Sequence, residues 1–129
     1  MFSIDSKESK YKNHKVTMSC HYGYTHRSKL EAAVCQIIMF REKAGELVHV
    51  GHEKQVYLTD AKILYIADFE CKNNLTGLPL FVESKGFASD RWPTIKKLWK
   101  FYGPAPLEIW TGSWQRPGLS EIIVPREVL

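Results

Sequence analysis

The sequence has no long hydrophobic run and few cysteines. Its longest apolar stretches fall far short of the roughly 20 residues that span a bilayer, so no membrane segment is expected. Residues 1–7 lack the charged and apolar regions of a secretory signal, which predicts a cytoplasmic protein. The three cysteines, Cys20, Cys35 and Cys71, form no Cys-x-x-Cys pair, and we interpret them as reduced thiols.

Zinc-binding motifs and sequence repeats are also missing. Cys20, His21 and His26, or alternatively His49 and His52, offer suitable side chains, but neither set has a recognisable spacing with a second ligand pair. A zinc site is therefore not expected. A chain of 129 residues with 44% hydrophobic content and no low-complexity segment predicts a single domain over residues 1–129.

Ionisable residues stand inside two of the most hydrophobic runs of the chain. Asp68 lies in residues 63–69, and Glu83 and Lys85 lie in residues 80–85. Both runs are rich in the β-branched and aromatic residues that favour strands, and the segment between them has a turn composition. We therefore predict a hairpin.

The geometry of this hairpin brings its charges together. A loop centred between Leu75 and Thr76 sets Asp68 opposite Glu83, and side-chain alternation places Lys85 on the same face as Glu83. Buried carboxylates that repel each other need a shared proton, a basic neighbour or a divalent cation. Two carboxylates and the backbone carbonyl of Ser84 would provide the oxygen ligands that Mg²⁺ prefers.

A simpler interpretation competes with the metal site. Glu83 and Lys85 alone are typical of an ion pair on the solvent-facing side of a sheet. Exposure of Asp68 and Glu83 to solvent would favour that interpretation. We favour the metal site because Asp68 adds a second acid at the opposing position of an apolar strand.

Asp68 and Glu83-Ser84-Lys85 resemble the core motif of the PD-(D/E)xK nuclease superfamily, with Ala67 in the place of its proline. The resemblance extends to a small phage and prophage family of uncharacterised nuclease-like domains. It is carried in order by residues 11–16, 27–32, 66–69 and 82–87 and covers about positions 11 to 110.

This resemblance implies a Mg²⁺-dependent endonuclease that hydrolyses DNA, with Mn²⁺ as a substitute metal, in the host cytoplasm if a phage encodes it. It implies Asp68 and Glu83 as metal ligands and Lys85 as the catalytic residue that orients or activates the attacking water. The superfamily also commonly uses a glutamate of its first helix as a catalytic metal ligand, and Glu31 matches that position.

Glu31 also has a structural interpretation. Ser28 and Glu31 fit a capping box, and apolar residues at helical spacing follow them, so a helix is expected over about residues 29–44 with Gly45 as its stop. Both roles can hold, because a first-turn glutamate lies at the rim of the surface that the helix packs on.

Basic residues are the expected DNA contacts. The net charge of +4 permits nucleic-acid binding without requiring it, and a solvated tail and helix face is the alternative interpretation. Basic groups contact phosphate without reading sequence. The predicted contacts are Lys12, Lys15, Arg27, Arg91, Lys96, Lys97 and Lys100.

The predicted fold class is α/β in the α+β sense, with a restriction-endonuclease-like core. The expected order is helix, three-strand meander, helix, strand, in a mixed sheet flanked by helices. Residues 1–12 are expected to form a polar basic arm. The other expected elements are strands over about 16–21, 53–58, 63–70, 80–85 and 107–110, and a helix from about 89 to 103.

The C-terminal segment, residues 111–129, is expected to be an appendage. A strand there would pack either on its own domain or on a second copy, so a homodimer is one of the two expectations.

Two other functions fit the same residues. One is a Holliday-junction or branch-specific resolving endonuclease, because superfamily relatives often dimerise and cut symmetric DNA. The other is a non-catalytic, nuclease-like phage protein that binds DNA or a host protein, for which metal would change neither melting temperature nor activity. The sequence does not decide between them, nor whether Lys85 acts as a base or stabilises the transition state.

Overall fold

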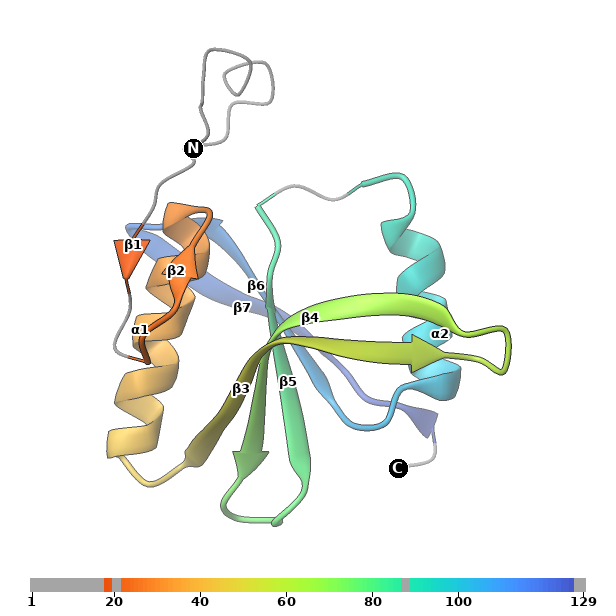
Figure 1. Cartoon of the computed structure of the whole chain (residues 1–129), viewed down its shortest axis with the longest axis horizontal. Coiled ribbons are helices and arrows are strands. Elements are labelled where there is room, and N and C mark those ends of the chain that lie inside the picture. The colour runs from red at the N-terminus through yellow and green to blue at the C-terminus, as the bar shows by residue number, and fades with distance from the viewer. Residues whose placement is uncertain (1–17, 20–21, 87–88, 127–129) are drawn as a thin grey trace.

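The computed structural model describes residues 18–19, 22–86 and 89–126. Over these residues the chain forms an α+β fold with two helices and a mixed, open five-stranded sheet in the order β3-β4-β5-β6-β7 (Figure 1). The predicted DNA contacts Lys12 and Lys15, and the arm over residues 1–12, lie outside the described residues.

Helix α1 spans Lys29–Lys43, one residue shorter than predicted. Ser28 caps it, because its Oγ accepts a hydrogen bond from the Glu31 N–H at 3.1 Å. Gly45 follows the helix with a φ of 83°, which explains why a glycine stands there. Neither helix in the described part of the chain combines the length and hydrophobicity that crossing a bilayer would require.

Three strands form the predicted meander: β3 (Leu47–Leu58), β4 (Ile63–Asn73) and β5 (Pro79–Ser84). The predicted hairpin register is confirmed, since Phe69 pairs with Val82 and the following pairs run down to the loop in step. Strand β3 begins at Leu47, earlier than expected, because a bulge near Gly51 and a positive φ at Glu53 interrupt the alternation on which the prediction relied.

Helix α2 spans Trp92–Tyr102, with Pro93 tolerated in its first turn as predicted. It leads into β6 (Leu107–Ser113), which lies parallel to β5, and β7 (Arg116–Ile123) pairs antiparallel with β6. The strand in the C-terminal segment thus extends the sheet of its own chain.

A separate two-stranded ribbon lies beside α1 (Figure 1). It consists of β1 (Met18–Ser19) and β2 (Thr25–His26). The strand predicted over residues 16–21 corresponds to β1, and the rest of that range lies outside the described residues. The ribbon places His26 at the N-terminal end of α1.

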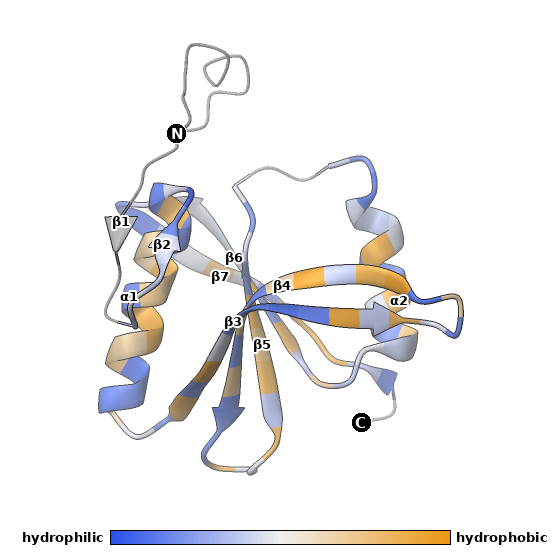
Figure 2. Ribbon diagram, viewed as in Figure 1, coloured by the Kyte–Doolittle hydropathy of each residue, from blue (hydrophilic) through white to orange (hydrophobic). Residues whose placement is uncertain are grey.

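The buried residues form two clusters, one under each helix. On β5, Leu80 and Val82 belong to the α1 cluster, whereas Phe81 belongs to the α2 cluster. On β4, Phe69 packs in the α1 cluster and Ala67 in the α2 cluster. The hydrophobic stretches of β4 and β5 lie between the two helices (Figure 2). Asp68 therefore lies where β4 passes from one cluster to the other.

Candidate active site

Strands β4 and β5 separate at Asp68 and Glu83. Their ladder ends at the pair Phe69 and Val82, after which β4 continues beside β3 and β5 beside β6. Beyond that pair, hydrogen bonds between backbone N–H groups and side chains replace the backbone hydrogen bonds of the ladder. The Asp68 N–H donates to Glu83 Oε1 at 3.0 Å, and the Ser84 N–H and Oγ donate to Asp68 Oδ2 at 2.9 and 2.7 Å. We call this place the fork.

Both acids of the fork are withdrawn from solvent. Glu83 is only 7% exposed, and Asp68 is partly buried, so the interpretation as an exposed ion-paired hairpin is wrong. Burial and the charge of Asp68 raise the pKa of Glu83 to about 8, against the opposing effect of Lys85. Burial and the charge of Glu31 raise the pKa of Asp68 to about 6, although hydrogen bonds from Ser84 act to lower it. The neighbouring groups of the fork thus do not fully compensate the burial of its two carboxyl groups.

Lys85 is the nearest cation to this acid pair among the described residues. Its Nζ lies 3.5 Å from Glu83 Oε2 and 4.4 Å from the centre of the Trp92 ring, with the Tyr65 ring at 5.6 Å. The Lys85 backbone N–H donates to the Trp110 carbonyl at 2.8 Å, which extends the bonding between β5 and β6 by one residue. Backbone and side chain are therefore both held in place.

Glu31 reaches the site from the first turn of α1. Its Oε2 lies 2.7 Å from His26 Nδ1 and 3.3 Å from His52 Nε2. Burial acts to raise the pKa of Glu31, but hydrogen bonds from the two histidines outweigh it and lower the pKa to about 2. Its charge acts on Asp68. The serine half of the predicted capping box is present, while the glutamate side chain is held by the histidines.

The sequence prediction missed His26 and His52 as partners of Glu31. The three residues come from β2, α1 and β3, and their spacing matches no metal-binding motif. One signal was available: His52 pairs with Phe69, the neighbour of Asp68, so a register for β3 would have placed it beside the fork. The bulge near Gly51 interrupts the side-chain alternation of β3, so this register could not be read from the sequence pattern.

The donor set at the fork fits a hard divalent cation. Asp68 and Glu83 each anchor one oxygen on the opposite strand. Asp68 Oδ1 has no hydrogen bond to any described residue, and Glu83 Oε2 lies 3.5 Å from the Lys85 ammonium group, with the Tyr65 hydroxyl also interacting with the Glu83 carboxyl group. Mg²⁺ prefers such carboxylate oxygens, and its charge would stabilise both acids in their ionised form. The carbonyl of Ser84 stays a predicted ligand.

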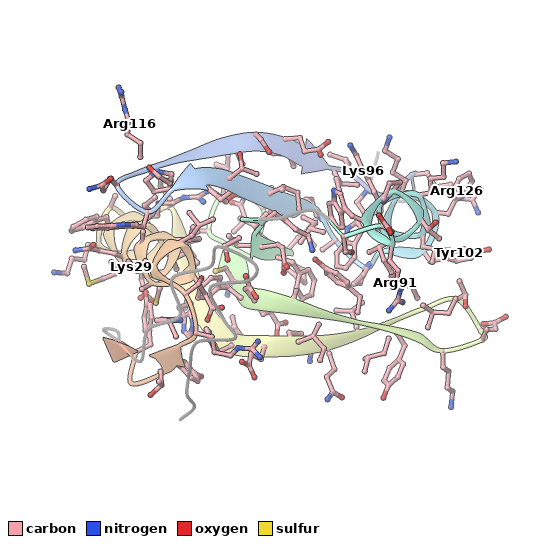
Figure 3. The ribbon with its side chains drawn as sticks, turned by 90° about the horizontal axis from the view of Figure 1, so that it is seen from above. Lys29, Arg91, Lys96, Tyr102, Arg116 and Arg126 are labelled. Atoms are coloured by element: carbon pink, nitrogen blue, oxygen red, sulfur yellow. The ribbon has the colours of Figure 1, made fainter. Side chains whose placement is uncertain are left out.

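The predicted DNA contacts do not form one patch over the described part of the chain. Arg27 lies 3.7 Å from Glu53, and Lys96 lies 2.9 Å from Glu121, so part of their charge is offset. Arg91 and Lys96 lie at α2, whereas Lys29, two residues after Arg27, lies at the opposite end of the molecule (Figure 3). The exposed basic residues of α2 and the turn before it are Arg91, Lys97 and Lys100.

Comparisons of the chain with protein-family models, with curated proteins and with solved structures gave no match. The case for a function therefore depends on the residues of the site.

Proposed function

We propose that the protein is a Mg²⁺-dependent DNA endonuclease with a restriction-endonuclease-like core. Asp68 and Glu83 would hold the metal together with the Ser84 carbonyl and Glu31, and Lys85 would act beside them. The observation that carries the proposal is the pair of acids at the fork, both with raised pKa values and with one ammonium group at 3.5 Å.

A phosphodiester resists hydrolysis through its negative charge and through the weakness of water as a nucleophile. Mg²⁺, when bound, supplies charge neutralisation at the phosphate and acidifies a coordinated water. The role of the protein is to hold the metal-binding oxygen atoms rigidly. Hydrogen bonds between β4 and β5 fix one oxygen of each acid, so the remaining oxygens keep their positions without reorganisation.

Lys85 is assigned the stabilisation of charge on the phosphate. Its Nζ forms an ion pair with Glu83, and the rings of Trp92 and Tyr65 lie near it. A fixed ammonium group in a partly desolvated site interacts more strongly with developing negative charge than it would in water. Exposed Arg91, Lys97 and Lys100 on the α2 side would contact flanking phosphates.

The proposal is tested by incubating the purified full chain with supercoiled, linear, single-stranded and four-way DNA in Mg²⁺, Mn²⁺ or chelator. We expect cleavage with either metal and none in chelator. Asp68→Asn and Lys85→Met should each lower the cleavage rate at least about a thousandfold, since Asp68 holds the metal and Lys85 stabilises charge on the phosphate. Preference for the four-way substrate would assign the branch-specific subclass.

Matched variants control for loss of charge. Glu70→Gln removes an acid two residues from Asp68 on the same strand, and Lys43→Met removes an exposed ammonium group from α1. Both should cleave DNA within a few-fold of the wild-type rate. Undiminished Mg²⁺-dependent cleavage by Asp68→Asn would exclude the fork as the active site, and the absence of cleavage in every arm would favour a non-catalytic binding protein.

A further inference from the structure

We infer that His26, Glu31 and His52 form a second metal site, which binds a Zn²⁺-class cation through nitrogen and oxygen ligands. One donor atom from each residue lies within 4.8 Å of the other two. The site shares Glu31 with the proposed nuclease centre, but its cation is of a different class. Binding there does not depend on the nuclease proposal, because it is a property of the protein without DNA.

The distances between the donors suit an ion of this class. Ligands about 2.1 Å from a tetrahedral or octahedral ion lie about 3.0–3.4 Å from one another. Glu31 Oε2 lies 3.3 Å from His52 Nε2, within that range, and 2.7 Å from His26 Nδ1. Binding would lengthen the His26 Nδ1–Glu31 Oε2 distance by a few tenths of an ångström.

The ligands are held in position by packing. The His52 ring stacks on Tyr24 with 4.3 Å between ring centres and meets Phe69 edge-on at 5.0 Å. The His26 ring meets His52 edge-on at 5.0 Å and is itself fully buried. Glu31 is fixed on the first turn of α1. Little ordering of side chains is needed when the ion binds.

His52 supplies the observation that points to a ligand. Its side chain is 5% exposed. Its Nδ1 is buried without a hydrogen-bond partner among the described residues, and its Nε2 has only Glu31 Oε2 near it, at a long 3.3 Å. Buried polar atoms normally have a partner, and one that lacks it calls for an ion or a water. A cation between His52 and Glu31 would coordinate Nε2.

The donor set selects the class of cation. Two imidazoles and one carboxylate suit Zn²⁺ and its neighbours in the transition series, whereas Mg²⁺ prefers oxygen ligands alone. Three protein ligands leave a position for water, as in metal sites that do chemistry. Because the charge of Glu31 acts on Asp68, a cation on Glu31 would also bring positive charge towards the fork.

The test uses the chelator-treated full chain titrated with Co²⁺, whose visible absorption reports coordination by nitrogen ligands. We expect one Co²⁺ per chain, displaced by Zn²⁺ and not by excess Mg²⁺. His52→Ala should weaken Co²⁺ binding at least about a hundredfold, since the loss of a second-shell partner alone costs ten- to a hundredfold. His52→Gln, which keeps a polar side chain, should weaken it as well, and thermal melting checks that both variants fold.

Two controls separate this site from its surroundings. His49→Ala removes a neighbouring histidine that stacks on Tyr22 with 3.8 Å between ring centres, and it should bind Co²⁺ as the wild type does. Asp68→Asn should also retain Co²⁺ binding, whether or not the wild type cleaves DNA. Equal Co²⁺ affinity in wild type and His52→Ala, or loss of binding only in a Cys20→Ser, His21→Ala variant, would overturn the inference.

Discussion

Two buried charged groups on the central strands differ in how completely their charges are matched. Glu108 of β6 accepts two hydrogen bonds from Arg41, at 2.8 and 3.1 Å, and a third from the Trp110 ring N–H at 2.9 Å. At the fork, Asp68 and Glu83 have only Lys85 as a cation within ion-pair distance among the described residues, at 3.5 Å.

This difference separates a structural ion pair from a candidate site. The guanidinium of Arg41 matches the carboxylate of Glu108 with two parallel bonds, and nothing further is needed. The acids of the fork have their pKa values raised because burial is not compensated. Buried groups in that condition are typical of places where a cation or a substrate completes the structure.

The largest effect on stability is expected from breaking the matched pair. Arg41→Met leaves Glu108 buried without its cation and should lower the free energy of unfolding by about 3–5 kcal/mol. Lys85→Met should cost about 1 kcal/mol or less, because the acids it leaves behind can take up protons. Urea unfolding at pH 7 in chelator measures both.

A double variant checks the explanation for Arg41. Arg41→Met with Glu108→Leu removes both charges and should regain most of the lost stability, because no uncompensated charge then remains. If the double variant is less stable than Arg41→Met alone, the packing of these side chains matters more than their charges.

Mg²⁺ should stabilise the fork and leave the matched pair unaffected. At pH 8, a Mg²⁺ concentration of a hundred times the dissociation constant should raise the free energy of unfolding by about 2.7 kcal/mol. The Asp68→Asn variant should show no such gain, whereas Glu70→Gln should keep it. Melting curves over a range of Mg²⁺ concentrations measure the effect, and an equal gain in Asp68→Asn would place the ion elsewhere.

The protonation of Glu83 should make stability depend on pH in chelator. The pKa of Glu83 is about 8 in the folded chain, against an ordinary value of 4.5, so the folded state binds more protons between these values. Stability should therefore fall as pH rises from 4.5 to 8. Glu83→Gln cannot ionise, and its advantage over the wild type should grow across that window by up to about 1.4 kcal/mol per pH unit. An advantage that is constant with pH would exclude ionisation as the cause.

The sequence predicted the part of the site that depends on local geometry. A turn centred at residues 75–76 and strict side-chain alternation determine the register of β4 and β5, so the pairing next to Asp68 and Glu83 followed directly. The sequence did not predict that side chains replace the ladder hydrogen bonds at the fork. That arrangement arises because β4 continues beside β3 while β5 continues beside β6.

The histidine partners of Glu31 were missed for a similar reason. His26, Glu31 and His52 come together through the packing of β2 and β3 against α1, and no local pattern encodes that contact. The bulge near Gly51 also breaks the alternation of β3, so even its beginning was placed too late.

The smallest effect is expected from the aromatic support of Lys85. Trp92 is half-buried, and the centre of its ring lies 4.4 Å from Lys85 Nζ, within the range of a cation–π contact worth about 0.5–2 kcal/mol. Trp92→Leu keeps an apolar side chain but removes the ring face, so Mg²⁺-dependent cleavage should slow about tenfold, with Mg²⁺ binding unchanged. Trp92→Phe should recover part of the rate, because a weaker ring face remains. If Leu and Phe variants slow equally, the ring supports the fold near Lys85 and does not orient its charge.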